Sequence, residues 1–271
     1  MPPPPKAPLC RPDPWRALGR FTSARIGLGR AGGSLPTAPL LEFQLCHARA
    51  RDAVQRDLDA AALETSLRQR GFEVLQLATA APDRRAFIRR PDQGRILSPD
   101  SRALLEGRAR CAEPFDAVFV IADGLSALAV EHHAAALLGL IAPRLIDPGW
   151  HLAPVCVVRQ GRVAVADEIG ALLPARMSVM LIGERPGLTS PDSLGIYLTW
   201  EPLPGRSNAE RNCISNVRPE GLHYARAAHK LFHLMSESRR LRLSGVGLKE
   251  DAPALPGEGN ELAPGATDGS P

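Results

Sequence analysis

Glu184 and Arg185 are charged residues that directly follow a run of apolar residues, Met177–Gly183. The run is short, ends in glycine and is soon followed by Pro186, so it has the character of a strand buried on both faces. In open α/β sheets, ligands bind beyond the carboxyl ends of the strands. The position of Glu184 and Arg185 therefore predicts a binding site rather than core packing.

Other polar residues lie near the expected ends of strands. Asp123 follows the apolar run Ala117–Ala122, so its carboxylate is expected either to cap backbone N–H groups or to meet a ligand, and capping is the preferred interpretation. Gly161–Val163 forms a second turn of this kind. The run Arg211–Asn216 has a composition suited to lining a polar pocket, although its Cys213 taken alone would be a small, buried and inert side chain.

The segment Gly27–Gly32 matches the dinucleotide-binding pattern G-x-G-x-x-G, and Asp52 follows about twenty residues later, where a ribose-binding acid would be expected. That motif requires a strand before it and a helix that opens within it. Thr22–Ile26 is a poor strand, and the next helix is expected only after Pro36. We therefore reject a dinucleotide site and interpret the segment as a glycine-rich connector.

His229 and His233 lie one helical turn apart, but Lys230 replaces the glutamate of H-E-x-x-H, and its charge would oppose a metal ion. We expect these histidines, together with His132 and His133, on solvated helix faces, and we predict no metal site. The sequence has no G-x-S-x-G elbow and no P-loop. Self-contained hydrolysis or phosphoryl transfer is therefore not expected, and no catalytic residue is assigned to this chain.

The elements that must position these residues alternate between short apolar runs and amphipathic segments. This alternation predicts an α/β fold with a mostly parallel, Rossmann-like sheet covered by helices. Strands are expected at Phe72–Leu77, Ala117–Ala122, Pro154–Val158, Met177–Gly183 and Leu194–Trp200, and helices at Leu125–Ile141, Ala166–Leu173 and Leu222–Leu243.

The composition predicts one globular unit with unstructured ends. The chain has 271 residues, of which 44% are apolar, so it can bury a sizeable core. Residues 15–71 have a helical pattern and form a small N-terminal helical region, and residues 72–249 are expected to form the α/β domain. The proline-rich residues 1–14 and residues 250–271, which are poor in large apolar side chains, are expected to be disordered.

Charge and cysteine content exclude several classes of protein. The net charge of +4 is small and aromatic residues make up only 4%, which argues against nucleic-acid binding. Five scattered cysteines without a C-x-x-C pair indicate reduced thiols rather than a disulfide framework. No apolar run is long enough to cross a membrane, and residues 1–5 lack the core of a signal peptide. We expect a soluble, cytoplasmic protein that binds neither nucleic acid nor membranes.

Four segments together resemble one protein family. In their order and approximate spacing they are similar to the small (light) subunit of ethanolamine ammonia-lyase, and the resemblance extends from about Arg25 to about Gly245. It implies a subunit of an adenosylcobalamin-dependent lyase that converts ethanolamine to acetaldehyde and ammonia by radical rearrangement. The four segments are Arg90-Pro-Asp-Gln-Gly-Arg95, Asp123-Gly-Leu-Ser126, Leu181-Ile-Gly-Glu-Arg-Pro-Gly-Leu188 and Cys213-Ile-Ser-Asn216.

The resemblance also implies how the work is divided between two chains. A large barrel subunit holds ethanolamine and the reacting groups, and this chain covers the cobalamin and is active only with that subunit. The cobalamin contacts of the family fall on Val163, Glu184 and Cys213. The resemblance implies that Val163 offers an apolar surface, Glu184 accepts hydrogen bonds and Cys213 packs as a compact wall. The motif D-x-H-x-x-G is absent, so the cofactor is expected to keep its own benzimidazole on cobalt.

The chain departs from some relatives at its start. Residues 1–5 are Met-Pro-Pro-Pro-Pro, whereas relatives from enteric bacteria begin with an amphipathic stretch, so packaging in a bacterial microcompartment is open. The spacing from Glu184 to Cys213 is one residue shorter than in some relatives, and the change belongs in the loop at residues 202–209. The alternative function is a stand-alone cobalamin or nucleotide carrier that uses the same crevice without catalysis.

Overall fold

The computed structural model describes residues 9–22, 24–109 and 113–253, and its centre is a six-stranded sheet with the order β1-β3-β2-β4-β5-β6. The first four strands in this order run parallel, and β5 and β6 continue the sheet antiparallel. The predicted α/β fold with a mostly parallel sheet is confirmed. The strands are β1 (Val74–Ala78), β2 (Val118–Ala122), β3 (Val155–Arg159), β4 (Met177–Gly183), β5 (Leu194–Trp200) and β6 (Arg211–Val217).

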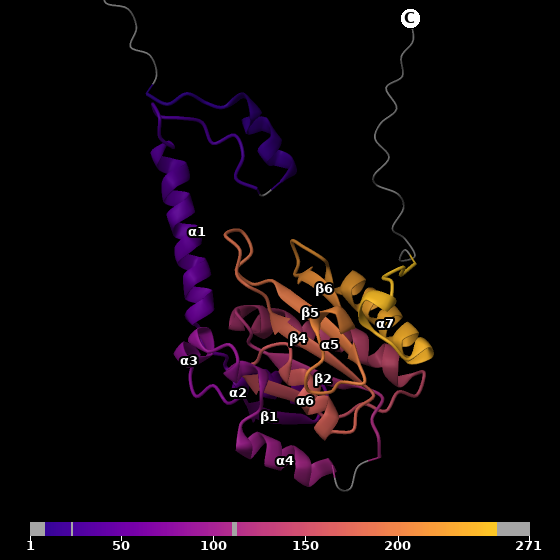
Figure 1. Ribbon diagram of the computed structural model, residues 1–271. Helices are drawn as coiled ribbons and strands as arrows, with labels where there is room; N and C mark the ends of the chain where they lie inside the picture. Colours follow the sequence, from indigo (N-terminus) through magenta and orange to yellow (C-terminus); the bar gives the residue numbers. More distant parts are fainter. Residues whose placement is uncertain (1–8, 23, 110–112, 254–271) are drawn as a thin grey trace, which may run out of the picture.

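Helices cover both faces of the sheet in three layers (Figure 1). On one face, α2, α5 and α7 pack on alternate strand residues such as Phe119 and Ile121. On the other face, α4 and α6 pack on the residues between them, such as Val118 and Val120. The helices are α1 (Thr37–Gln55), α2 (Ala60–Gln69), α3 (Arg84–Arg89), α4 (Pro99–Ala109), α5 (Ala127–Ile146), α6 (Val165–Leu172) and α7 (Tyr224–Leu241).

The predicted strands with continuous apolar sequence lie where they were expected. All seven residues of β4 and all five of β2 are buried, which is typical of strands covered on both faces. The bounds of β4 and β5 agree with the prediction, and β1 and β3 begin one or two residues later than expected. No helix had been predicted at α3 or α4.

The strand β6 was not predicted. The run Arg211–Asn216 was interpreted as the lining of a pocket because most of its residues are polar, yet it forms the edge strand of the sheet and pairs with β5. An edge strand with one solvated face carries polar residues at alternate positions. Here Cys213 and Ser215 are exposed on one face, and Ile214 is buried on the other.

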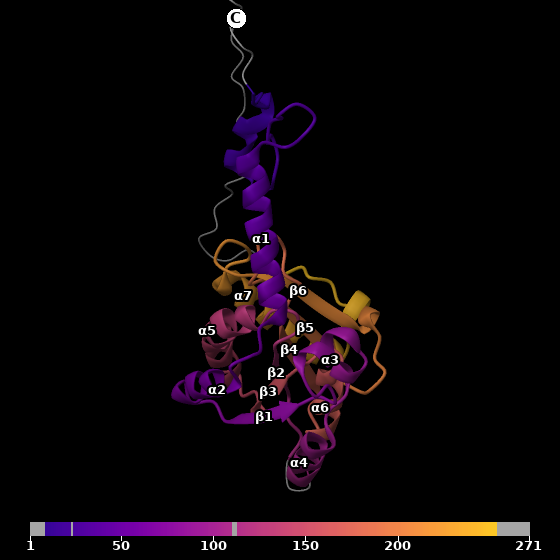
Figure 2. The same ribbon diagram turned by 90° about the vertical axis from the view of Figure 1, so that its left-hand side faces the viewer.

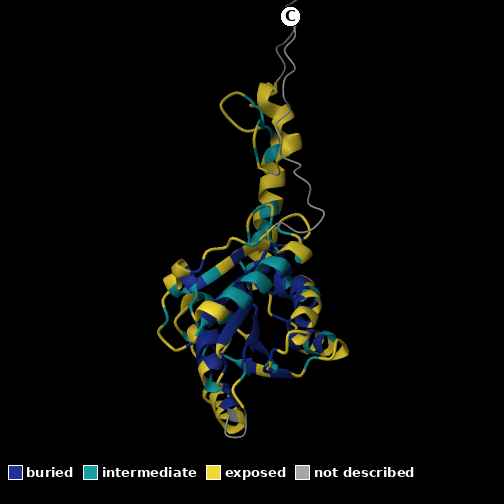
Figure 3. Cartoon of the chain, turned by 90° about the vertical axis from the view of Figure 1, so that its right-hand side faces the viewer, coloured by how far each residue is buried: buried dark blue, intermediate teal, exposed yellow. Residues whose placement is uncertain are grey.

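The first residues form an arm that extends away from the sheet (Figure 2). We define the arm as residues 9–22 and 24–55. It contains a 3₁₀ helix at Pro14–Phe21 and the long helix α1, of which only Ala53 is buried. Burial colouring separates the exposed arm from the buried sheet (Figure 3).

Several sequence expectations concern the ends of the chain and its surroundings. Within the regions expected to be disordered, residues 1–8 and 254–271 lie outside the described residues. The division into a helical region at residues 15–71 and an α/β domain at residues 72–249 stays a prediction. Gly71 follows Arg70, the C-cap residue of α2, and has a φ of 85°, which fits the expected helix end. None of the helices in the described part combines the length and apolar character that a membrane crossing requires.

Candidate functional site

The turns after β2, β3 and β4 meet at the carboxyl edge of the parallel strands. The backbone N–H of Gly161 donates to Asp123 Oδ1 at 3.0 Å, which joins the β3 turn to the β2 turn. The N–H of Leu125 donates to the carbonyl oxygen of Gly183 at 3.0 Å, which joins the β2 turn to the end of β4. The polar turns that the sequence predicted after these three strands therefore lie together at one edge of the sheet.

The contact between the β2 turn and β4 requires glycine. A Cβ atom at Gly183 would lie 2.0 Å from the carbonyl oxygen of Ser126 and 2.5 Å from that of Asp123. At Gly124, which has a φ of 52°, a Cβ atom would lie 2.3 Å from the carbonyl oxygen of Gly183. The two backbones can approach this closely only because neither residue has a side chain. Glu184 is fixed at the edge by this packing.

Two hollows adjoin at this edge. One has a volume of about 660 Å³ and is lined by residues that include Val163 and Cys213. The other has a volume of about 390 Å³ and is lined by residues that include Val163 and Glu184. Arg162, Val163 and Tyr197 line both, so the hollows are continuous at these residues. We call the two hollows together the rim site.

The structure brings the three predicted cofactor contacts together around the rim site. Val163 lies in the β3–α6 turn, half-buried, and Glu184 follows β4 directly. Glu184 Oε2 accepts hydrogen bonds from the hydroxyl of Ser193 and from the backbone N–H of Asn216, the latter at 3.2 Å. Cys213 was expected at or just beyond a strand end, but it lies inside β6 and faces the hollow across from Tyr197.

Tyr197 is a residue of the rim site that the sequence interpretation did not identify. It lies within the predicted strand β5, half-buried, next to Cys213 on β6. Burial raises the pKa of Tyr197 to about 12, and the neighbouring Cys213 and Glu184 add to the shift. The phenol is therefore neutral near pH 7 and serves as a hydrogen-bonding wall. The only signal in the sequence was an aromatic residue with a polar hydroxyl in the middle of a mostly apolar strand.

Arg162 is the second residue of the rim site that was not identified. Its guanidinium carbon lies 4.3 Å from the centre of the Phe87 ring, and its backbone N–H donates to the carbonyl oxygen of Gly94 at 2.7 Å. Burial lowers the pKa of Arg162, the positive charges of Arg84 and Arg95 lower it further, and Asp123 opposes them. The placement depends on segments far apart in the sequence, so no local motif predicts it.

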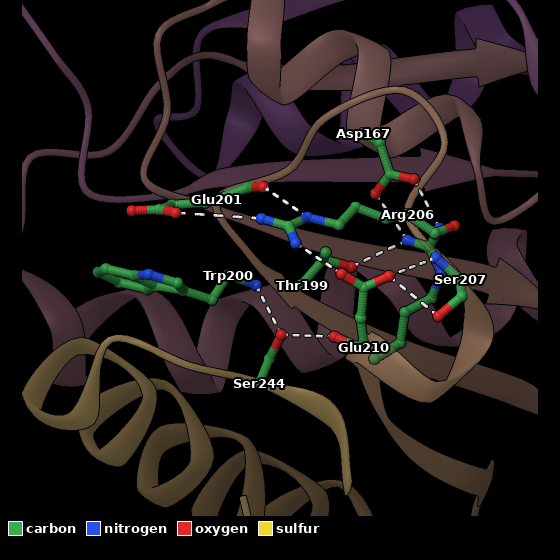
Figure 4. A network of polar contacts seen from close by, with 9 residues as sticks. Asp167, Thr199, Trp200, Glu201, Arg206, Ser207, Glu210 and Ser244 are labelled. Atoms are coloured by element: carbon green, nitrogen blue, oxygen red, sulfur yellow. Dashed lines mark hydrogen bonds and ion pairs between the residues drawn. The ribbon is translucent and has the colours of Figure 1, made fainter. Parts of the chain in front are cut away.

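The β6 wall of the rim site is fixed by a buried ion pair. Arg211 donates from both terminal nitrogens to the two oxygens of Asp167 on α6, each at 2.6 Å, and it also donates to Thr199 Oγ1 at 3.0 Å. Beside this pair, Arg206 Nη1 lies 2.5 Å from Glu210 Oε1, and Ser207 caps the same carboxylate (Figure 4). These contacts join α6 to both antiparallel strands.

Asp123 does not line the rim site. It is fully buried, with Oδ1 held by the N–H of Gly161 and Oδ2 lying 3.0 Å from Nη1 of Arg84. Its carboxylate therefore binds backbone N–H, as preferred from the sequence, but it holds the β3–α6 turn while Ser126 caps α5. Asp123 thus positions the turn that carries Arg162 and Val163.

The glycine-rich segment has no dinucleotide-binding context in the described residues. Gly27, Gly29 and Gly32 all have positive φ and lie in an irregular connection within the arm. The described part of that connection contains no regular strand before the glycines, and α1 begins only at Thr37. This local structure agrees with the expectation of a glycine-rich connector, and the absence of a dinucleotide site stays a prediction.

One group of side chains among the described residues lies close enough to share a metal ion. His133 Nε2 and His132 Nδ1 lie 3.5 Å and 3.7 Å from Asp192 Oδ2. The expectation that both histidines are on the surface was wrong for His133, which is buried and has its Nδ1 2.7 Å from the hydroxyl of Tyr224. The prediction of no metal site stays a prediction.

A further cavity, similar in size to the larger hollow of the rim site, lies elsewhere. It has a volume of about 670 Å³ and is lined by residues before the amino ends of the parallel strands, among them Phe72, Phe115 and Trp150. None of the predicted contact residues lines it. The rim site is therefore the candidate functional site.

Comparisons with known proteins agree on one family. A family model described as "Ethanolamine ammonia-lyase light chain (EutC)" matches residues 12–249. The chain is 56% identical over 254 residues to the ethanolamine ammonia-lyase small subunit of Azotobacter vinelandii. These residues make up 93% of this chain and 94% of the relative. It is 57% identical over 242 residues to that of Ralstonia nicotianae, with 89% of each chain covered. It is 55% identical over 249 residues to the small subunit of Pseudomonas paraeruginosa, with 92% of this chain and 91% of the relative covered.

Proposed function

Because this chain belongs to the family of ethanolamine ammonia-lyase light chains, we propose that its rim site forms one wall of an adenosylcobalamin site, and that a larger subunit forms the other. The whole enzyme would convert ethanolamine to acetaldehyde and ammonia. On this proposal the larger subunit holds the substrate and the reacting groups. This chain contributes binding and no catalytic residue.

The observation that carries the proposal is the convergence of three side chains. Val163, Glu184 and Cys213 come from three separate strands or turns, yet all line the adjoining hollows. Cys213 and Ser215 are exposed on the same face of β6. An open face of this kind fits one wall of a shared site better than a self-contained pocket.

The chemistry of the rim site suits a large cofactor that carries many carboxamides. Glu184 Oε1 accepts no hydrogen bond from the described residues, so it can accept one from an amide N–H or a ribose hydroxyl, while Oε2 is already occupied. Val163 offers a small apolar surface, and Cys213 a compact, polarizable one. None of these roles requires proton transfer or a thiolate.

Bound adenosylcobalamin supplies the difficult step, homolysis of its cobalt–carbon bond, and the protein binds, orients and shields the cofactor. The residues of this chain would contribute by positioning the corrin side chains and by excluding water from one side of it. The glycine contacts between the β2 turn and β4 and the ion pair between Arg211 and Asp167 hold these residues in place before the cofactor binds.

The arm supports the need for a partner. The relatives are named small subunits, which implies a larger one. The helix α1 and the segment before it leave many large apolar side chains exposed to solvent, which supports the proposal that this arm packs on another chain. These side chains include Trp15, Leu18, Phe21, Ile26, Leu35, Leu40, Leu41, Phe43 and Leu45.

Reconstitution tests this proposal. The chain is mixed with the large subunit of an ethanolamine ammonia-lyase, and ammonia release from ethanolamine is measured with and without adenosylcobalamin. We expect ammonia only when both chains and the cofactor are present. An inactive pair would count against the lyase assignment. Tight cobalamin binding by the isolated chain would instead favour the carrier function, in which no partner is required.

A further inference from the structure

The rim site carries more positive charge than its carboxylates can neutralise. Arg95 and Arg162 line one hollow, and Arg162 and Arg185 line the other. Within the described residues, none of the three lies within 4.0 Å of a carboxylate oxygen, the distance that defines an ion pair. Glu184 is the one carboxylate that lines either hollow, and its Oε2 is already hydrogen-bonded.

Two other arginines that line the larger hollow, Arg206 and Arg211, differ from these three because they have carboxylate partners. In the same wall, Arg211 is paired with Asp167 at 2.6 Å, and Arg206 is paired with Glu210 at 2.5 Å. The arginines that stabilise the fold thus have carboxylate partners. Arg95, Arg162 and Arg185 line the hollows without a carboxylate partner in the described part of the chain, and this is the arrangement expected of an anion-binding site.

Arg162 is the most constrained of the three. Its guanidinium lies over the Phe87 ring, and its Nε is buried without a hydrogen-bond partner among the described residues. A buried donor of a charged group that lacks an acceptor is costly. Asp123, the nearest carboxylate that attracts it, is already paired with Arg84 at 3.0 Å. An anionic ligand would therefore accept a hydrogen bond from Arg162 and neutralise its positive charge.

We propose that Arg162, with Arg95 and Arg185 beside it, binds a phosphate ester in the rim site, and that in the cobalamin complex this is the phosphodiester of the nucleotide loop. This inference rests on the proposed function. Planar guanidinium groups form paired hydrogen bonds with phosphate oxygens. Arg162 would thus make the site selective for complete cobalamin over corrinoids that lack the nucleotide loop.

Corrinoid binding to the reconstituted two-chain complex tests the inference. Dissociation constants are measured for cobalamin and for cobinamide, which has the corrin ring but neither the nucleotide nor its phosphodiester. In Arg162→Met, cobalamin affinity should fall about tenfold to hundredfold, while cobinamide affinity stays near the wild-type value. Arg162→Lys should recover part of the loss. Arg240→Met is the control, because Arg240 is exposed on α7 and paired with Glu237 at 2.5 Å.

The alternatives give different results. Equal weakening of both corrinoids by Arg162→Met would assign Arg162 to the fold of the turn, and unchanged cobalamin affinity would remove it from the site; either result overturns the inference while the proposed function stands. If the wild-type complex binds neither corrinoid, the proposed function itself fails. Binding of adenosine monophosphate that depends on Arg162 would then identify a free phosphate ester as the ligand, and its absence would also exclude the anion site.

Discussion

At the scale of single residues, the two carboxylate oxygens of Glu184 differ. Oε2 accepts two hydrogen bonds within the chain, and Oε1 accepts none from the described residues. Ser193 and the N–H of Asn216 hold Oε2, and a Cβ atom at position 195 would lie 3.0 Å from Oε1, so Gly195 leaves room for the carboxylate. A carboxylate fixed in this way loses little entropy when it accepts a further hydrogen bond. Glu184 is therefore predicted to accept a hydrogen bond from the ligand, and its side chain is expected to contribute little to the free energy of folding.

We predict that Glu184→Ala weakens the cobalamin affinity of the two-chain complex without a large change in thermal stability. The open acceptor is lost, but Glu184 is only half-buried at the end of β4. Cys213→Ser should have a milder effect, because the two side chains are close in volume and no nucleophile is lost. Equilibrium titration with cobalamin and thermal melts measure both quantities. Unchanged affinity in Glu184→Ala would remove this residue from the site.

At the scale of elements, β6 is attached to α6 by Arg211 and Asp167, whose side chains are 3% and 1% exposed. Removing one partner of such a pair leaves a buried group without its counter-charge, which costs about 3–5 kcal/mol. We predict that Arg211→Met lowers the free energy of unfolding by about that amount, measured by urea denaturation. In the double variant Arg211→Met/Asp167→Leu, most of the loss should be recovered. A small effect of the single variant would show that β6 is held by other contacts.

The loop between β5 and β6 predicts a dependence of stability on pH. Hydrogen bonds from the backbone and hydroxyl of Ser207, together with Arg206, lower the pKa of Glu210 to about 2 from an ordinary 4.5. A carboxylate with a lowered pKa stabilises the folded state above its unfolded pKa, and this contribution is lost as the pH falls through the folded value. Between about pH 4.5 and pH 2, Glu210→Gln should therefore lose less stability than the wild type. Parallel curves in acid denaturation would contradict this.

The elements differ in how well the sequence predicts them. For β4, continuous apolar residues specify burial on both faces, and the predicted bounds agree with the structure. For β6, alternating polar residues describe an edge strand as well as they describe a loop, so the local pattern does not decide between them. The same limit applies to the rim site. Glu184 follows from its place after a strand, but Arg162 depends on Phe87, which only the tertiary fold brings beside it.

At the scale of the whole molecule, packing within the chain does not explain how the arm is stabilised. Helices in proteins are stabilised chiefly by the packing of an apolar face. Yet α1 buries only Ala53, and Leu41 and Leu45 on successive turns are 58% and 50% exposed. We infer that the arm packs on the larger subunit.

We predict that the double variant Leu41→Glu/Leu45→Glu folds with the wild-type melting temperature but fails to co-purify with the larger subunit. The charges would be placed where the apolar contact should form, while the α/β core is untouched. Ile146→Glu is the control, because Ile146 is 62% exposed at the end of α5, on the side of the amino ends of the strands. An intact complex in the double variant would contradict this role of the arm. If instead the isolated chain is a dimer that the variant dissociates, the arm packs on a second copy.

The most direct measurement is a cobalamin titration of four samples: the larger subunit alone, this chain alone, the mixture, and the mixture with Glu184→Ala. If the rim site forms one wall of the cofactor site, tight binding requires both chains and is weaker in the variant mixture. Equal affinity of the larger subunit alone and of the mixture would place the whole cofactor site outside this chain and contradict the account.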